Sequence, residues 1–245
     1  QRQMCIRDRI VRIADGAPVA LEKAALDNMA RVSSRIQRAI EQGQTIYGLT
    51  TGVGDLVTTR LSPDRMTDTQ LNMLRSHACG VGPDLTVREV RAMMAVTLKS
   101  LLQGYSGVTP ALAQRIADML NRQVTPWSPA GGSVGYLIAT AHIGLAVFGE
   151  GKCWYQGELL PAQQALTRAG IPPYVPGPRE GHALVGGTYE ITAVGCLAVA
   201  DFQRLLPVAD MAGGMCLEAM RGNTRGYDAP VSYTHLRAHE TCADL

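Results

Sequence analysis

A glycine-rich loop holds the first residue whose type suggests chemistry. The segment reads Tyr-Gly-Leu-Thr-Thr-Gly-Val-Gly over residues 47–54 and follows a predicted helix, not a strand. Dinucleotide and phosphate loops follow a strand, so this context argues against both. Because glycines permit positive φ and close backbone approach, Tyr47 is either an ordinary buried ring or an acid–base group at a binding site.

Further short motifs follow this loop along the chain, and they contain the candidate histidines. They read SHACGVG at 76–82, GYSG at 104–107, GSVG at 132–135 and EGHAL at 180–184. His77 stands at the end of a predicted helix, where an imidazole can cap carbonyls or hydrogen-bond a ligand. His142, in an apolar segment, and His182, in a predicted loop, are expected to be structural.

Neither a metal site nor a disulfide framework is predicted. The six cysteines form no CxxC pair and no grouping with histidine, a pattern that fits a reducing cytoplasm. His235 and His239 have the spacing of two metal ligands on one helical face. Both lie in a terminal segment that we expect to be foreign, so we discount them.

Both ends of the chain resemble translated sequencing-adapter read-through. The segments are QRQMCIRDR at 1–9 and VSYTHLRAHETCADL at 231–245. We therefore treat both as tails and expect residues 10–230 to carry the fold.

Composition limits the class of partner. Of the 245 residues 46% are hydrophobic but only two are Phe and two are Trp, so the core is expected to be aliphatic. The formal net charge is +2 without a Lys/Arg cluster, which predicts neither a nucleic-acid surface nor a membrane surface. No uninterrupted apolar run reaches the roughly 18 residues of a membrane span. We expect a cytoplasmic protein with a small-molecule partner.

Apolar periodicity predicts the helices that would position the motifs. An amphipathic helix over 21–40 is closed by Gly43, and a second begins at Ser62-Pro63 and ends near Gly80. A capping box of Thr86 and Glu89 begins a third helix, and Thr109-Pro110 begins a fourth.

The second half of the chain is also mainly helical by pattern. Residues 134–149 carry no charge, which predicts a central helix buried by partner helices. The Pro- and Gly-rich stretch 171–187 predicts a long loop, and 188–221 predicts helix interrupted at Pro207 and at Gly213-Gly214. With only a little strand expected near 152–160, the predicted class is all-α.

The order and spacing of these motifs resemble the histidine and phenylalanine ammonia-lyases, the aromatic amino acid ammonia-lyase family. The shared pattern is a YGxxTGxG loop, an SHAxGxG helix end, a GxSG turn, a GSVG segment, a GEG turn at 149–151 and an EGxAL segment. The resemblance covers roughly residues 17–228. It implies an aspartase/fumarase-like helical bundle, truncated before the C-terminal half.

The resemblance also implies domains, an assembly and site residues. Residues 10–187 would form the N-terminal lyase domain and 188–230 the start of the central helical bundle of a homotetramer. Tyr47 would be the catalytic base for the β-proton of an α-amino acid. His77 would bind the substrate side chain by hydrogen bonding a polar ring. The remaining carboxylate- and amine-binding groups of the family would lie beyond Pro230.

The sequence departs from the family where the electrophile forms. In the family, GSVG is followed by Ala-Ser-Gly, which cyclises into methylidene-imidazolone, and then by DLAPLAH. Here Gly135 is followed directly by Tyr136 and LIATAH, so the tripeptide is absent. The Asn of the family's Asn-Gly-Thr is replaced by Gly186. We expect no cofactor and no metal.

Three functions follow from these residues. The first is the family activity, non-oxidative elimination of ammonia from an aromatic or imidazole L-amino acid. The second is an electrophile-less homologue that acts as a scaffold or as an amino-acid-binding subunit. The third is a changed enzyme whose substrate carries a more acidic proton or a better leaving group.

Overall fold

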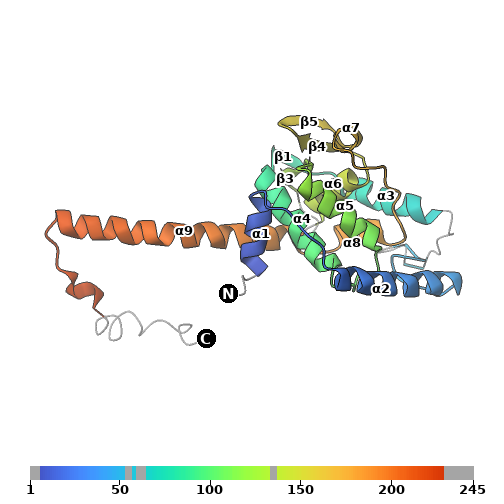
Figure 1. Cartoon of the computed structure of the whole chain (residues 1–245), viewed down its shortest axis with the longest axis horizontal. Helices are drawn as coiled ribbons and strands as arrows, with labels where there is room; N and C mark the ends of the chain where they lie inside the picture. Colours follow the sequence, from blue (N-terminus) through green and yellow to red (C-terminus); the bar gives the residue numbers. More distant parts are fainter. Residues whose placement is uncertain (1–5, 53–56, 59–64, 133–136, 229–245) are drawn as a thin grey trace. The chain divides into compact units, whose positions relative to one another are not determined.

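The structure is a computed structural model that describes residues 6–52, 57–58, 65–132 and 137–228. Helices dominate and the strands are short, which confirms the all-α prediction (Figure 1). The chain divides into two compact units, 1–198 and 199–245. The predicted domain boundaries at 187 and 230 stay predictions.

The first unit holds most of the helices and all the described strands. Its helices are α1 (Ile6–Ala14), α2 (Lys23–Glu41), α3 (Met66–His77), α4 (Val87–Leu101), α5 (Pro110–Asn121), α6 (Ile138–Val147), α7 (Ala162–Arg168), α8 (Glu180–Val185) and the start of α9 (Tyr189–Ala219). Its strands are β1 (Val81–Asp84), β2 (Thr125–Pro126), β3 (Pro129–Gly131), β4 (Lys152–Tyr155) and β5 (Glu158–Pro161).

Two helix starts are fixed by the capping residues that the sequence indicates. The Thr86 hydroxyl accepts from the Glu89 N–H at 3.2 Å, while the Glu89 carboxylate accepts from the Thr86 N–H at 2.7 Å, which completes a capping box. The Thr109 side chain caps α5, whose first residue is Pro110. The predicted start of the second helix at Ser62-Pro63 lies outside the described residues.

Arg91 of α4 ties three helices together from inside the core. Its guanidinium is 2% exposed and donates to the Ile13 carbonyl at 2.8 and 3.1 Å and to the Leu120 carbonyl at 3.0 Å. Both acceptors are carbonyls at or near helix C-termini, which carry partial negative charge. Helix α1, which contains Ile13, thus packs on α4 although it begins within the segment predicted to be foreign. The presence of this helix neither supports nor contradicts the expectation that residues 1–9 are foreign.

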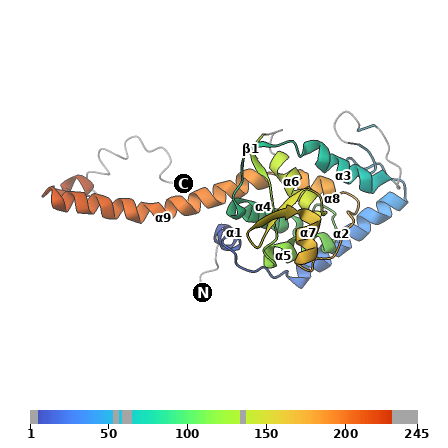
Figure 2. The ribbon, with the colours of Figure 1, turned by 90° about the horizontal axis from the view of Figure 1, so that it is seen from above.

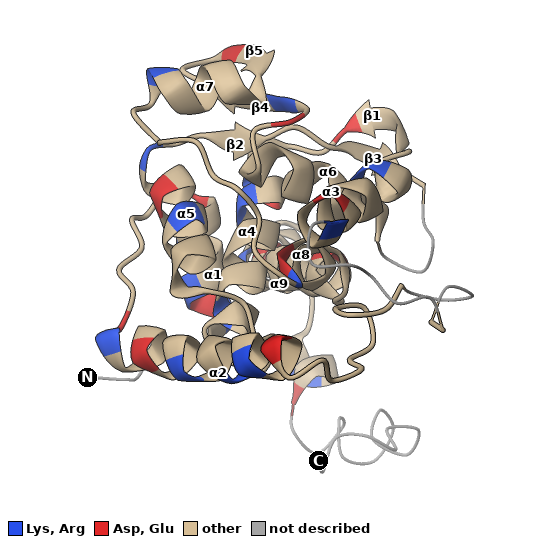
Figure 3. Ribbon diagram, turned by 90° about the vertical axis from the view of Figure 1, so that its right-hand side faces the viewer, with Lys and Arg blue, Asp and Glu red and all other residues tan. Residues whose placement is uncertain are grey.

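Helix α6 is central, as its lack of charge predicts. It is buried along nearly its whole length and packs against α3 and α8 (Figure 2). Figure 3 shows no charged residue on α6, whereas α2 carries both positive and negative residues. The burying elements belong to this chain, so α6 does not need helices from elsewhere to cover it.

The strands form two small antiparallel sheets. β1 pairs with β3, which brings the segment after His77 beside the segment that leads into α6. β4 lies between β2 and β5, and the β4–β5 hairpin confirms the strand expected near 152–160.

The prediction of one continuous loop over 171–187 is wrong, because α8 occupies its second half. Gly177 donates its N–H to the buried Glu180 carboxylate at 2.7 Å, and this bond organises the first turn. Ala183, Leu184 and Val185 are buried and supply the apolar face. Gly181 sits so close to the Gln70 carbonyl that a Cβ would collide with it, so the glycine serves packing and does not signal a loop here.

The predicted interruptions of the last helix are also wrong. α9 continues through Pro207 and through Gly213-Gly214 to Ala219. A proline within a helix costs about 3 kcal/mol and a glycine about 1 kcal/mol relative to alanine, penalties that weaken a helix without forbidding it.

The second unit, taken by itself, consists of the rest of α9 and a 3₁₀ turn over Thr224–Tyr227. Its apolar side chains are exposed, namely Val199, Phe202, Leu205, Leu206, Val208, Met211 and Met215. By length and composition the stretch 180–219 qualifies as a membrane span, a test that a core helix also passes.

The core is aliphatic, as the composition predicts. Among the described residues, Tyr189 is the one aromatic side chain in the fully buried apolar set. Cys153 of β4 belongs to this core, and its burial raises the pKa of the thiol to about 12. Cys79, after α3, is exposed.

These two cysteines should differ sharply in reactivity. Because the thiolate is the nucleophile, iodoacetamide at mildly alkaline pH should alkylate Cys79 in the native protein and leave Cys153 unmodified. Denatured protein, as the control, should be modified at both. Peptide mass spectrometry checks this, and native labelling of Cys153 at the rate of Cys79 would contradict the burial described here.

Candidate active site

Tyr47 is presented by a short, well-fixed turn after α2. Gly48 adopts φ +64°, a left-handed conformation that favours glycine, and Leu49 is completely buried beneath the turn. The Thr50 hydroxyl accepts from the Ile46 N–H at 2.7 Å. With the turn anchored in this way, the Tyr47 side chain is left 51% exposed.

The ring that Tyr47 meets is that of His182 on α8. The two rings lie edge to face, with centroids 6.1 Å apart and an interplanar angle of 69°. The backbone N–H of His182 donates to the side-chain oxygen of Gln70, a buried residue of α3, at 3.0 Å. The Tyr47 turn, α8 and α3 are therefore joined at this point.

His77 lies in the last turn of α3, and its tautomer is assigned by its neighbours. Nδ1 is 2.8 Å from the Met73 carbonyl and 3.0 Å from the Ser76 hydroxyl. A carbonyl only accepts, so Nδ1 carries the proton and Nε2 of the neutral ring offers a lone pair. His77 can therefore accept a hydrogen bond from a ligand O–H or N–H.

His142 fixes the backbone that follows His77. Its Nε2 accepts from the Gly80 N–H at 3.2 Å, and its ring lies edge-on to Trp127 at a centroid distance of 5.6 Å. Burial lowers the pKa of His142, which keeps the ring neutral and able to accept. This geometry supports the structural role expected for it.

A buried carboxylate holds the start of α8. Glu180 is 0% exposed and accepts from the Thr109 hydroxyl at 2.7 Å, the Thr109 N–H at 3.2 Å and the Gly177 N–H at 2.7 Å. The Tyr174 hydroxyl donates to both carboxylate oxygens, at 3.0 and 3.1 Å. Burial, and then the charge of Glu180, raises the pKa of Tyr174, so this phenol stays a donor.

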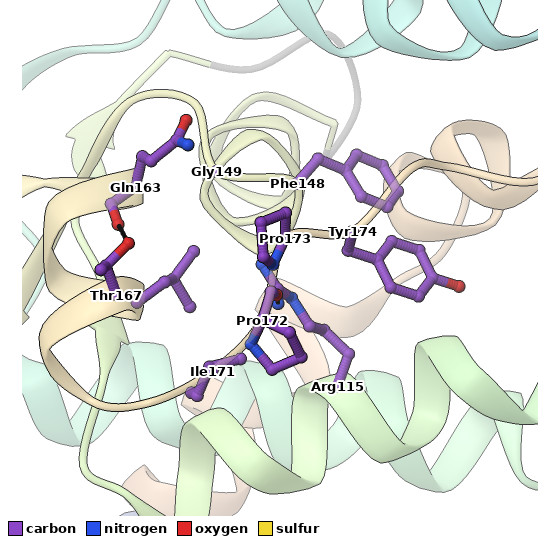
Figure 4. Close-up of a pocket in the computed structure, with 10 residues that line it drawn as sticks. Arg115, Phe148, Gly149, Gln163, Thr167, Ile171, Pro172, Pro173 and Tyr174 are labelled. Atoms are coloured by element: carbon purple, nitrogen blue, oxygen red, sulfur yellow. Dashed lines mark hydrogen bonds between the residues drawn. The ribbon is translucent and has the colours of Figure 1, made fainter.

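A cavity of about 160 Å³ lies beside Tyr174 of this network, and neither Tyr47 nor His77 is among the residues that line it (Figure 4). Arg115, Phe148 and Tyr174 line it, among others. The Arg115 guanidinium is 5% exposed, donates to the carbonyls of Val147 and Pro172, and lies 5.7 Å from the centre of the Tyr174 ring. These contacts hold the end of α6 to the segment before α8.

The family's prosthetic group does not fit the residues present. β3 ends at Gly131 and α6 begins at Ile138, and the residues that connect them contain no Ala-Ser-Gly. On the other side, Gly186 stands where the family has an Asn, and a Cβ there would lie 3.1 Å from the His182 carbonyl oxygen and 3.4 Å from Cδ2 of its ring. The positions that would form and flank the methylidene-imidazolone have therefore both changed.

Metal chemistry has no support in the described part of the chain. Within it no group of three or more His, Cys, Asp or Glu side chains could hold a metal ion. His235 and His239 lie outside the described residues.

Tyr47 and His77 both lie within the described residues, and their site roles stay predictions. His182 contacts the Tyr47 ring and its backbone N–H is bonded to Gln70 in the first half of α3, whereas His77 is the last residue of that helix. The sequence interpretation put His182 in a loop and treated it as structural. No local sequence signal indicates its contact with Tyr47, which comes from a distant part of the chain.

Known structures and sequences define the class of this fold. The solved tyrosine aminomutase from Streptomyces globisporus superposes with a TM-score of 0.89 at 31% identity, over 96% of this chain and 44% of that one. Histidine ammonia-lyase of Sorangium cellulosum (strain So ce56) is 41% identical over 219 residues, 87% of this chain and 43% of that protein. The histidine ammonia-lyase of Geobacillus thermodenitrificans (strain NG80-2) is 37% identical over 222 residues, 89% of this chain and 44% of that protein.

These similarities place the chain among the all-α, aspartase-like ammonia-lyase folds. The model of the aromatic amino acid lyase family matches residues 7–244, and the chain belongs to that family. It spans less than half the length of the curated relatives it matches.

Glu180 should be essential for the stability of this region. Glu180→Ala would leave two N–H and two O–H donors without their acceptor, which should lower the free energy of unfolding of the complete protein by about 3 to 5 kcal/mol. Glu158→Ala, at a β5 carboxylate paired with Arg168 on the surface, is the matched control and should cost less than about 1 kcal/mol. Denaturant unfolding measures both, and equal losses would show that the Glu180 network is not stabilising.

Proposed function

We propose that the complete protein is an amino acid ammonia-lyase of the histidine ammonia-lyase type, whose site takes an aromatic or imidazole L-amino acid. The observation that carries this is the contact of the Tyr47 ring with His182 of α8, a helix that is bonded to Gln70 of α3, the helix that ends in His77. The names of the similar proteins support the same substrate class, because they act on histidine, tyrosine or phenylalanine.

In the proposed reaction Tyr47 handles the β-proton. A phenol can serve as a base when it is ionised or strongly polarised, and it must reach the substrate carbon. The half-exposed ring, on a turn anchored by Leu49 and Thr50, meets the requirement of access. His77 Nε2 would accept from a histidine ring N–H or a tyrosine hydroxyl and so select a polar side chain.

A second candidate is favoured by one specific observation, the absence of Ala-Ser-Gly after Gly135. Without an electrophile, ammonia is a poor leaving group and the β-proton is barely acidic. The protein would then be an electrophile-less homologue that binds an amino acid without releasing ammonia, or an enzyme with a different substrate. We propose a cytoplasmic homotetramer in either case, without a nucleic-acid or membrane partner.

Restoring the electrophile separates the two candidates. If the complete protein is an ammonia-lyase, it releases ammonia with its present sequence; if it is an electrophile-less homologue, it shows no loss of two waters in the peptide 131–142 and no ammonia release. Inserting Ala-Ser-Gly after Gly135, together with Tyr136→Asp and Gly186→Asn, should produce both. Adding Tyr47→Phe to that variant should abolish turnover while leaving binding nearly unchanged.

Intact peptide mass and an ammonia assay are the measurements. Ammonia release by the unaltered protein would support the first candidate, the ammonia-lyase, despite the missing tripeptide. Turnover that survives Tyr47→Phe would remove the base assignment.

His77 should discriminate among ligands. Losing a hydrogen bond from a desolvated site costs about 1 to 3 kcal/mol, so His77→Leu should weaken histidine or tyrosine binding roughly 5- to 150-fold. Phenylalanine, which lacks a polar ring group, should bind as before. Calorimetric titration of the complete protein with the three ligands measures this, and equal losses for all three would mark His77 as structural.

A further inference from the structure

The two ring nitrogens of His182 differ in their hydrogen bonding. Within the described part of the chain, Nδ1 is the one buried side-chain nitrogen or oxygen without a hydrogen-bond partner. A buried polar atom left unpaired costs about 1 to 3 kcal/mol, so such an atom in a folded protein calls for a functional explanation.

The tautomer of His182 follows from its other neighbours. Burial lowers the pKa of the ring, and the charge of Arg179 lowers it further, whereas a hydrogen bond to the Gly48 backbone raises it. A bond that raises the pKa is one that the ring N–H donates to a carbonyl. Because Nδ1 has no partner, this N–H is on Nε2, and Nδ1 presents a lone pair.

The surroundings of that lone pair are those of the proposed site. The ring lies edge-on to Tyr47, which is 51% exposed and marks the open side of the cluster. On its other side is Gly186, the position at which the family carries an Asn side chain. A Cβ there would lie 3.4 Å from Cδ2 of the ring, so position 186 is in direct contact with the imidazole.

We propose that His182 is a ligand-binding residue and that its Nδ1 accepts a hydrogen bond from the α-ammonium group of the bound amino acid. This rests on the proposed function, in which Tyr47 faces the β-carbon and His77 takes the side-chain ring. The α-ammonium lies one carbon from the β-carbon, so it falls beside Tyr47, where His182 stands. A neutral acceptor suits a cationic donor, and the carboxylate of the same ligand offsets the charge of Arg179.

Nδ1 is buried in the ligand-free chain, so a neighbouring side chain must move before the ammonium can reach it. The half-exposed Tyr47 ring is the neighbour best placed to shift, since side-chain rotamer changes at a binding site are common. The hydrogen bond made to the ligand then replaces the one that Nδ1 lacks.

The test compares two ligands that differ in one group. L-Phenylalanine carries the α-ammonium, and 3-phenylpropanoate has the same ring and carboxylate without it. In the complete protein, His182→Leu should weaken L-phenylalanine binding by about 10- to 100-fold and leave 3-phenylpropanoate unchanged. His182→Asn, whose side-chain oxygen can take the place of Nδ1, should retain most of the affinity for L-phenylalanine.

Calorimetric titration provides the affinities, and thermal unfolding checks that both variants keep the fold. Unchanged L-phenylalanine binding in His182→Leu overturns the inference and leaves the proposed function standing. Equal losses for both ligands, or a loss in His182→Asn as large as in His182→Leu, assign the ring to packing and also overturn it. If the unaltered protein binds no aromatic or imidazole amino acid, the proposed function fails and the inference fails with it.

Discussion

The buried carboxylate of Glu180 is the interaction on which the candidate site depends. It accepts from the cap of α5 at Thr109, from Tyr174 and from Gly177, and thereby fixes where α8 begins. Two residues further on stands His182, whose ring direction follows from that start. Burying a carboxylate away from water is costly unless hydrogen bonds satisfy its oxygens. Here two N–H and two O–H donors provide those hydrogen bonds. The same donors would be unsatisfied without it, so carboxylate and loop stabilise each other.

Hydrogen bonds to the backbone hold the histidine rings of this region in place. His142 accepts from Gly80, and His77 donates to Met73. Burial lowers the pKa of both His142 and His182, which prevents a second proton from removing the acceptor. A backbone bond at one nitrogen therefore determines what the other nitrogen can offer, either to the protein or to a ligand.

Local chemistry made much of this fold predictable, and long-range packing accounts for the failures. The caps at Thr86 and Thr109, the uncharged α6 and the β4–β5 hairpin are encoded within a few residues of themselves. Gly181, by contrast, looks like a loop residue, but its lack of a side chain allows α8 to approach the Gln70 carbonyl. Tyr47 and His77 could be named from motifs, whereas His182 could not, because its neighbours Tyr47 and Gln70 are more than a hundred residues away in sequence.

Gly186 and His182 are direct neighbours, so a side chain at position 186 would pack against the histidine. A Cβ at 186 would lie 3.4 Å from Cδ2 of the His182 ring, which is an ordinary contact distance. The Asn belongs with the prosthetic group in the family, and the tripeptide that forms this group is absent here. On the proposed function, the polar atom offered to a ligand beside Tyr47 is therefore Nδ1 of His182 and not an Asn side chain.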